Sequence, residues 1–114
     1  MADRSINLTE KTLLALIEQL RPEDPEIRKQ LDYGYRFDNQ IIYIYEIRPQ
    51  WNDPSIYQSM DFAKIRYYKT RRNWNLYWMR ASGKWELYDP YPVSTNLGKL
   101  LKIIREDKYG CFFG

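Results

Sequence analysis

Histidine is missing from this 114-residue chain, and cysteine occurs only once, at Cys111. Without histidine the chain cannot form the usual zinc sites, and it has no Ser-His or Cys-His pair to supply a nucleophile. A single cysteine excludes an internal disulfide and is typical of a reducing compartment. We therefore expect no metal, no cofactor and an inert thiol, and we favour a protein that is not an enzyme.

Long apolar runs are also missing. No apolar stretch approaches the roughly 20 residues that a membrane-spanning helix needs. The first residues, MADRSINLTEK, lack an apolar segment after a basic one, so they do not resemble a secretory signal. These absences predict a soluble, cytoplasmic protein that does not enter membranes.

Aromatic residues, in contrast, are abundant, with eleven tyrosines and four tryptophans. Such side chains bury large areas, so we expect a folded chain, and its length is typical of a single domain, residues 1–114. The net charge is only +3, but residues 62–84 hold seven basic residues and no acidic one. This segment can create a local positive field.

Apolar residues at helical spacing predict helices near both ends. Residues 7–31 should be helical, with Asn7 as the first cap, Pro22 as the end of the first helix, and a short second helix from Asp24-Pro25 that turns Ile27 to the core. The apolar stripe of the first helix is Leu13, Leu16, Ile17 and Leu20.

The C-terminal part, residues 94–114, predicts one more helix and a tail. Ser94 or Thr95 can cap this helix, and Phe112 and Phe113 should dock the tail because aromatic side chains seldom stay in water. The apolar stripe of this helix is Leu97, Leu100, Leu101 and Ile104.

Residues 33–88 predict an antiparallel sheet of about five strands. The first two, 33–37 and 40–48, flank a turn at Asp38-Asn39. The second is apolar on both alternating sets, so either set could face the core. We expect an irregular loop from Pro49 to about Met60, with Trp51 folded over the edge of the core.

The stretch 61–88 should form three strands, joined by two-residue turns at Arg71-Arg72 and Ser82-Gly83. These registers place an apolar set on the core face: Ile65, Tyr67, Leu76, Trp78, Trp85 and Leu87. A basic and aromatic set occupies the other face: Lys64, Arg66, Tyr68, Tyr77, Met79, Lys84, Glu86 and Tyr88. The expected fold class is α+β, with the helices packed mainly on one face of the sheet.

The uncovered sheet face is the best candidate for function. Lysine and arginine neutralise phosphates and tyrosines stack on bases, so this face predicts a binding module for an anionic partner, nucleic acid first. The candidate binding residues are Lys64, Arg66, Tyr68, Arg71, Arg72, Tyr77 and Tyr88. The alternatives are an ordinary solvated face and a structural protein that uses this face to form a homo-oligomer.

A pocket for a small anionic ligand, or for an enzyme's substrate, is a further alternative. Arg80 and Trp85 could form a cation–π pair at the end of the sheet. The residues that could line the pocket are Glu46, Arg48, Trp51, Arg80 and Trp85. A structural Glu-Arg ion pair beside an aromatic stack would explain the same residues, and no partner acid or base is evident, so no catalytic residue is assigned.

Three blocks of sequence resemble a known family. They are IRPQW at 47–51 followed by Asp53-Pro54, YWMRA at 77–81 followed by Lys84-Trp85, and EDKYGCFFG at 106–114. Their order and spacing resemble an uncharacterised bacterial family, domain of unknown function 3024, from about Ile27 to Gly114. Members often carry a histidine shortly after the Lys-Trp pair, where this chain has Glu86. The resemblance implies a stand-alone bacterial domain and supplies no catalytic residue.

Overall fold

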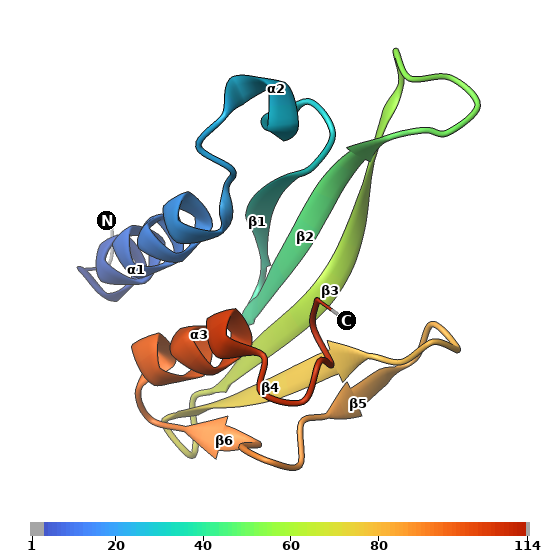
Figure 1. The fold of residues 1–114 in the computed structure, drawn as a ribbon. Coiled ribbons are helices and arrows are strands. Elements are labelled where there is room, and N and C mark those ends of the chain that lie inside the picture. The colour runs from blue at the N-terminus through green and yellow to red at the C-terminus, as the bar shows by residue number, and fades with distance from the viewer. Residues whose placement is uncertain (1–3, 114) are drawn as a thin grey trace.

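The computed structural model describes residues 4–113, which form helices at both ends and an antiparallel sheet between them. The elements in chain order are α1 (Arg4–Leu20), α2 (Pro25–Arg28), β1 (Asp32–Asp38), β2 (Ile41–Pro49), β3 (Tyr57–Tyr68), β4 (Asn73–Met79), β5 (Trp85–Leu87), β6 (Val93–Ser94) and α3 (Leu97–Glu106). The strands pair in the order β1-β2-β3-β4-β5, and β6 pairs with β4 (Figure 1). This confirms the α+β class.

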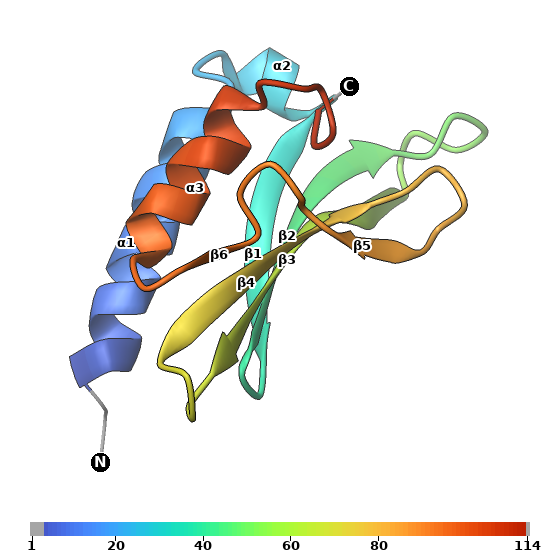
Figure 2. The ribbon, with the colours of Figure 1, turned by 90° about the horizontal axis from the view of Figure 1, so that it is seen from below.

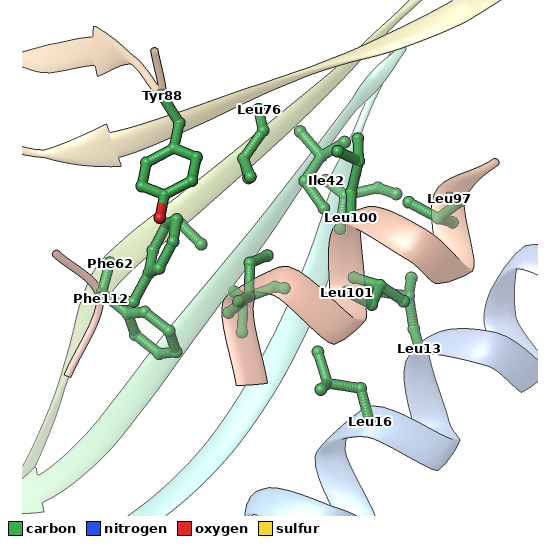
Figure 3. Packing of buried hydrophobic residues seen from close by; sticks show 14 of the residues in the cluster. Leu13, Leu16, Ile42, Phe62, Leu76, Tyr88, Leu97, Leu100, Leu101 and Phe112 are labelled. Carbon is green, nitrogen blue, oxygen red and sulfur yellow. The ribbon is translucent and has the colours of Figure 1, made fainter. Parts of the chain in front are cut away.

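Both long helices lie on the same face of the sheet, as predicted (Figures 1 and 2). Every predicted stripe residue of α3 is buried, and three of the four in α1 are buried while Leu20 packs against them. Figure 3 shows Leu100 and Leu101 of α3 between the strands and Leu13 of α1. The period of 3.6 residues is therefore sufficient to identify the faces of both helices.

The core face of β2 consists of Ile42 and Ile44, both with no exposed surface. This settles the ambiguity of that strand, because its alternate residues then point to the opposite side of the sheet. A β-bulge interrupts the pairing of β2 with β3 after Ile44, and two consecutive residues of β3, Phe62 and Ala63, are both buried there. The bulge reverses the inward-outward alternation of β3 at this point.

The predicted helix starts need correction. α1 begins at Arg4, so Asn7 lies inside the helix rather than at its cap. Asp24 does cap α2, through a 2.9 Å hydrogen bond from the Glu26 backbone N–H, but α2 is a single turn and Ile27 is 52% exposed instead of facing the core. A single helical turn presents too few side chains on one side to pack against the sheet.

At α3, the cap is Asn96, whose side-chain oxygen accepts the Lys99 N–H at 3.3 Å, and not Ser94 or Thr95. The C-cap of the helix is Asp107, which has a φ of 41°. The Asp107 carboxylate then accepts the backbone N–H groups of Phe112 and Phe113, at 3.0 and 2.8 Å. These hydrogen bonds turn the tail back onto the core.

The Phe112 ring lies 5.1 Å from that of Tyr88, and both are buried (Figure 3). Phe113 is 38% exposed, but its ring lies 5.1 Å from Phe62 and 6.0 Å from Tyr33. The end of the chain thus packs beside the bulge on the helix side of the sheet.

The turn between β4 and β5 differs from the prediction in a way that changes the faces. The Arg80 N–H bonds the Lys84 carbonyl and the Gly83 N–H bonds the Arg80 carbonyl, so the loop has three residues, 81–83, with Gly83 at a φ of 84°. Met79 therefore pairs with Trp85, one residue away from the predicted register. A shift of one residue moves Trp85 and Leu87 off the predicted core face and Tyr88 onto it.

The other two turns also differ, with smaller consequences. Residues 69–72 form a four-residue loop, so Ile65 pairs with Leu76 instead of Trp78. A shift of two residues keeps every side chain on its predicted face. Between β1 and β2 the turn is Asn39-Gln40, one residue later than predicted, and Asn39 adopts a φ of 56° that asparagine tolerates well.

The predicted irregular loop up to Met60 is wrong, because β3 begins at Tyr57 and pairs with β2 back to Pro49. Residues 46–60 comprise the paired ends of β2 and β3 and the loop between them. They extend beyond α1 and α3 and are here called the hairpin arm (Figure 1). Trp51, in its loop, is 93% exposed and does not fold over the core. No layer of helix lies beside the arm to cover that side chain.

Candidate functional site

The side of the sheet opposite α1 and α3 carries a group of basic and aromatic residues from strands β1 to β5. We call this the outer face, and it comprises Arg36, Tyr43, Lys64, Arg66, Tyr68, Tyr77 and Trp85, with Arg71 in the adjoining turn. Strand alternation directs them away from the buried Ile42, Ile65 and Leu76. Residues far apart in the chain therefore share one surface.

The cations at the centre of the outer face lie over aromatic rings. The ammonium nitrogen of Lys64 is 4.8 Å from the centre of the Tyr77 ring and 5.7 Å from that of Trp85. The centre of the Trp85 ring lies 6.1 Å from that of the Tyr43 ring. The guanidinium carbon of Arg36 lies over the Tyr43 ring, 4.3 Å from its centre. Each such contact contributes about 0.5–1 kcal/mol at an exposed site, and together the contacts restrict these side chains.

A second group surrounds Tyr68 at the other end of the face. The guanidinium carbon of Arg66 lies 5.0 Å from the centre of the Tyr68 ring, and that of Arg71 lies 4.3 Å from it. The Tyr68 hydroxyl is 3.2 Å from the Tyr77 hydroxyl. Burial and this hydrogen bond raise the pKa of Tyr77. Tyr77 is therefore neutral at pH 7 and adds no negative charge to the face.

The cations of the outer face differ in their pairing. Arg36 makes two hydrogen bonds to Asp61, at 2.5 and 2.8 Å, and this pairing raises its pKa. Among the ion pairs of the described residues, none includes Lys64, Arg66 or Arg71. The positive charge predicted from residues 62–84 is thus not neutralised by acids that fold back onto it at these positions.

The structure brings five of the seven predicted binding residues together: Lys64, Arg66, Tyr68, Arg71 and Tyr77. Arg72 is exposed in the same turn, at a φ of 52°. Tyr88 is the exception, because it is 2% exposed and packs in the core. The three-residue loop before β5 causes this difference, since it shifts the register by one residue.

Three members of the outer face were missed by the binding-face prediction: Arg36, Tyr43 and Trp85. Both sides of β2 are apolar, so the sequence did not show that Tyr43 faces outward. The face of Arg36, which pairs with Tyr43 from β1, could not be predicted for the same reason. Trp85 had been assigned to the core by the two-residue turn. The three-residue alternative for residues 81–83, with Gly83 in its last position, was the signal that could have identified Trp85.

The alternative pocket does not form from its predicted residues. Glu46 pairs with its neighbour Arg48 at 3.1 Å, while Arg80 lies 3.7 Å from Glu86. Trp51 is exposed at the end of the arm, and Trp85 lies against Tyr43. Figure 1 shows the β2–β3 and β4–β5 loops leaving the sheet in different directions. The two ion pairs agree with the alternative interpretation, in which Glu46, Arg48 and Arg80 form structural Glu-Arg pairs rather than a ligand pocket.

No group of three or more metal-ligating side chains occurs within residues 4–113. Burial, and then the negative charge of Asp107, raises the pKa of the Cys111 thiol. A raised pKa reduces the thiolate fraction and does not favour nucleophilic chemistry. Among the helices of this part of the chain, none combines the length and apolar composition needed to span a membrane.

Fold and site together define a small α+β protein with helices on one face of an antiparallel sheet and an uncovered basic and aromatic face. The family model described as "Domain of unknown function (DUF3024)" matches residues 1–114, and the chain belongs to that family. This confirms the resemblance of the three sequence blocks. Comparisons with the curated proteins and with the solved structures gave no match.

Proposed function

We propose that this protein is a binding module for an anionic partner, nucleic acid first, and that the outer face is its binding surface. The observation that carries the proposal is the environment of Lys64, Arg66 and Arg71. Each lies over an aromatic ring on the uncovered side of the sheet, and none belongs to an ion pair of the described residues.

Cations without carboxylate partners can neutralise phosphates at little cost. An ion pair must first be broken before its cation can bind a phosphate, whereas a cation on a ring keeps its charge available. Because the rings also restrict Lys64, Arg66 and Arg71, less side-chain entropy is lost when a phosphate binds. A row of such cations along β3 and its turn matches the repeated charges of a nucleic-acid backbone.

The aromatic rings favour a single strand over a duplex. Tyr43, Tyr68, Tyr77 and Trp85 lie on one sheet surface, and antiparallel sheets with such side chains bind unpaired bases by stacking. In a duplex the bases already stack on one another and present only their edges. We therefore expect tighter binding to a single strand than to a duplex of equal length.

Fluorescence anisotropy with a labelled single-stranded oligonucleotide at low salt tests the proposal. Arg66→Ala should weaken binding about threefold to tenfold, for loss of a phosphate contact. Tyr77→Ala should weaken it about fivefold or more, for loss of a stacking ring. Lys102→Ala is the matched control, because Lys102 lies on α3 on the other side of the sheet and pairs with Glu106 at 3.9 Å. No binding at low salt, or an equal loss with Lys102→Ala, would refute the proposal.

A further inference from the structure

The hairpin arm contains an unpaired strand edge. Residues 57–61 of β3 pair with β2 on one side, but pairing with β4 begins only at Ala63. No other ribbon lies along this edge in Figure 1. The Gln50 N–H bonds the Ile56 carbonyl at 2.8 Å, so the alternation of an antiparallel ladder directs the backbone groups of Tyr57, Ser59 and Asp61 away from β2.

This edge lacks the features that usually prevent strands from pairing. β1, the edge strand on the other side of the sheet, carries the charges of Asp32, Arg36 and Asp38. The edge strand of the arm reads YQSM at 57–60, four residues with no charge and no proline before Asp61. Lysine, proline and charged residues are the common protections of an exposed edge. The edge of the arm is therefore available for pairing with another strand, whereas the charges of β1 disfavour such pairing.

Large apolar side chains surround the same edge. The exposed ones in the arm are Trp51 at 93%, Ile56 at 47%, Tyr57 at 51% and Met60 at 57%. Single exposed apolar residues are normal, but a group on one projecting element is typical of an interaction surface. Trp and Tyr are also the residues that most often dominate the binding energy of protein interfaces.

We propose that this edge pairs with the same edge of a second copy of the chain, antiparallel, about a two-fold axis at Ser59. In this register Ser59 faces its own counterpart, and Tyr57 faces Asp61 of the other copy. Both copies then use the same outward N–H and C=O groups, which is the requirement of a symmetric interface. The register allows about six backbone hydrogen bonds between the two arms.

A second copy is favoured over a partner recognised by charge because residues 57–60 are uncharged, and the one charge of the paired segment, Asp61, already forms an ion pair with Arg36 of its own chain. A partner recognised by charge would require charged side chains that 57–60 lacks. The exposed apolar side chains of one arm offer on the order of 500 Å², somewhat below the roughly 800 Å² that each partner buries in a standard interface. The dimer should therefore be weak and reversible, dissociating in the micromolar range or above.

Sedimentation velocity of the full chain over a wide concentration range tests this proposal. Ser59→Lys and Ser59→Glu each place two like charges opposite each other at the two-fold axis, and each should weaken the dimer about fivefold. A mixture of the two variants places opposite charges there and should restore association to at least the wild-type level. Gln40→Lys, in the exposed β1–β2 turn, is the charge-matched control and should leave the dimer unchanged.

Circular dichroism of each variant verifies that the fold is kept. A wild-type chain that stays monomeric at every concentration overturns the proposal. So does a dimer that neither Ser59 variant weakens, or a mixture that associates no better than its components. A dimer abolished by Arg66→Ala but insensitive to Ser59→Lys would place the interface on the outer face instead.

Discussion

The salt dependence of the proposed nucleic-acid binding is the most quantitative consequence of that proposal. The outer-face cations Lys64, Arg66 and Arg71, and the neighbouring Arg72 that the sequence also predicted to bind, belong to no ion pair of the described residues. Each phosphate neutralised on a single strand contributes a slope of about −0.7 to log K against log salt, so four give about −3. Raising salt from 50 to 200 mM should then weaken wild-type binding about 50-fold.

Arg66→Ala removes one of the proposed phosphate contacts. The slope should fall to about −2, and the same rise in salt should weaken binding of the variant only about 20-fold. Anisotropy titrations at four or five salt concentrations measure both slopes, with Lys102→Ala as the control that keeps the wild-type value. A wild-type slope near zero, or a slope that Arg66→Ala does not change, would refute the assignment of these cations as phosphate contacts.

Three further predictions concern stability, each measured by urea unfolding. Asp32→Asn should lower the free energy of unfolding by about 1–2 kcal/mol at pH 7, because it removes a paired carboxylate. The pKa of Asp32 is lowered in the folded protein, so this stabilisation is present above the ordinary aspartate pKa and is lost as the pH falls through the folded-state pKa; an equal cost at pH 2 would contradict the prediction. Leu100→Ala, at a site with no exposed surface, should cost about 2–5 kcal/mol, whereas Leu14→Ala, at a half-exposed site, should cost well under half as much; similar losses would mean the helix faces are wrong. Gly34→Ala places a methyl group 2.7 Å from the Tyr45 ring and should lower the free energy of unfolding by about 1 kcal/mol in the wild-type chain. The cost should be smaller when Tyr45 is also replaced by alanine, and equal costs in both backgrounds would show that the ring is not the obstacle.

The pH dependence predicted at Asp32 follows from two opposing causes. Burial raises the pKa of the carboxyl, but hydrogen bonds from Arg21, at 2.7 and 3.0 Å, and from the Tyr33 backbone N–H outweigh burial and lower it. Arg21 follows the last turn of α1 and Asp32 begins β1. The pair therefore fastens the helix to the edge of the sheet, and protonation below the folded pKa releases it.

Helix faces could be predicted from the sequence because their period is a local property. All the stripe residues of α1 and α3 lie in or against the core. Strand faces depend instead on the number of residues in each hairpin loop. The four-residue loop 69–72 differs from the prediction by an even number and keeps Lys64 and Tyr77 on one face, whereas the three-residue loop 81–83 differs by one and exchanges Trp85 with Tyr88.

Trp51 shows a different limit of sequence reasoning. An aromatic side chain is normally buried, but burial needs a second layer, and the long helices α1 and α3 do not extend along the arm (Figure 1). The strand character of residues 57–60 was also not visible locally, since Gln58 and Ser59 are not among the β-branched and aromatic residues that are enriched in strands. Residues 57–60 pair because β2 continues to Pro49 and offers a partner along its whole length.

The two proposals are connected by the geometry of the sheet. An antiparallel pair of identical strands is related by a two-fold axis perpendicular to the sheet, so a dimer through Ser59 would present both outer faces on the same side. The two rows of cations would then lie on one continuous surface and could engage one long strand together. A 30-nucleotide oligonucleotide should therefore lose more affinity than a 10-nucleotide one when Ser59→Lys is introduced, because only the longer strand can contact both copies. Equal losses for the two lengths would show that each copy binds independently, even if both the dimer and the binding face exist.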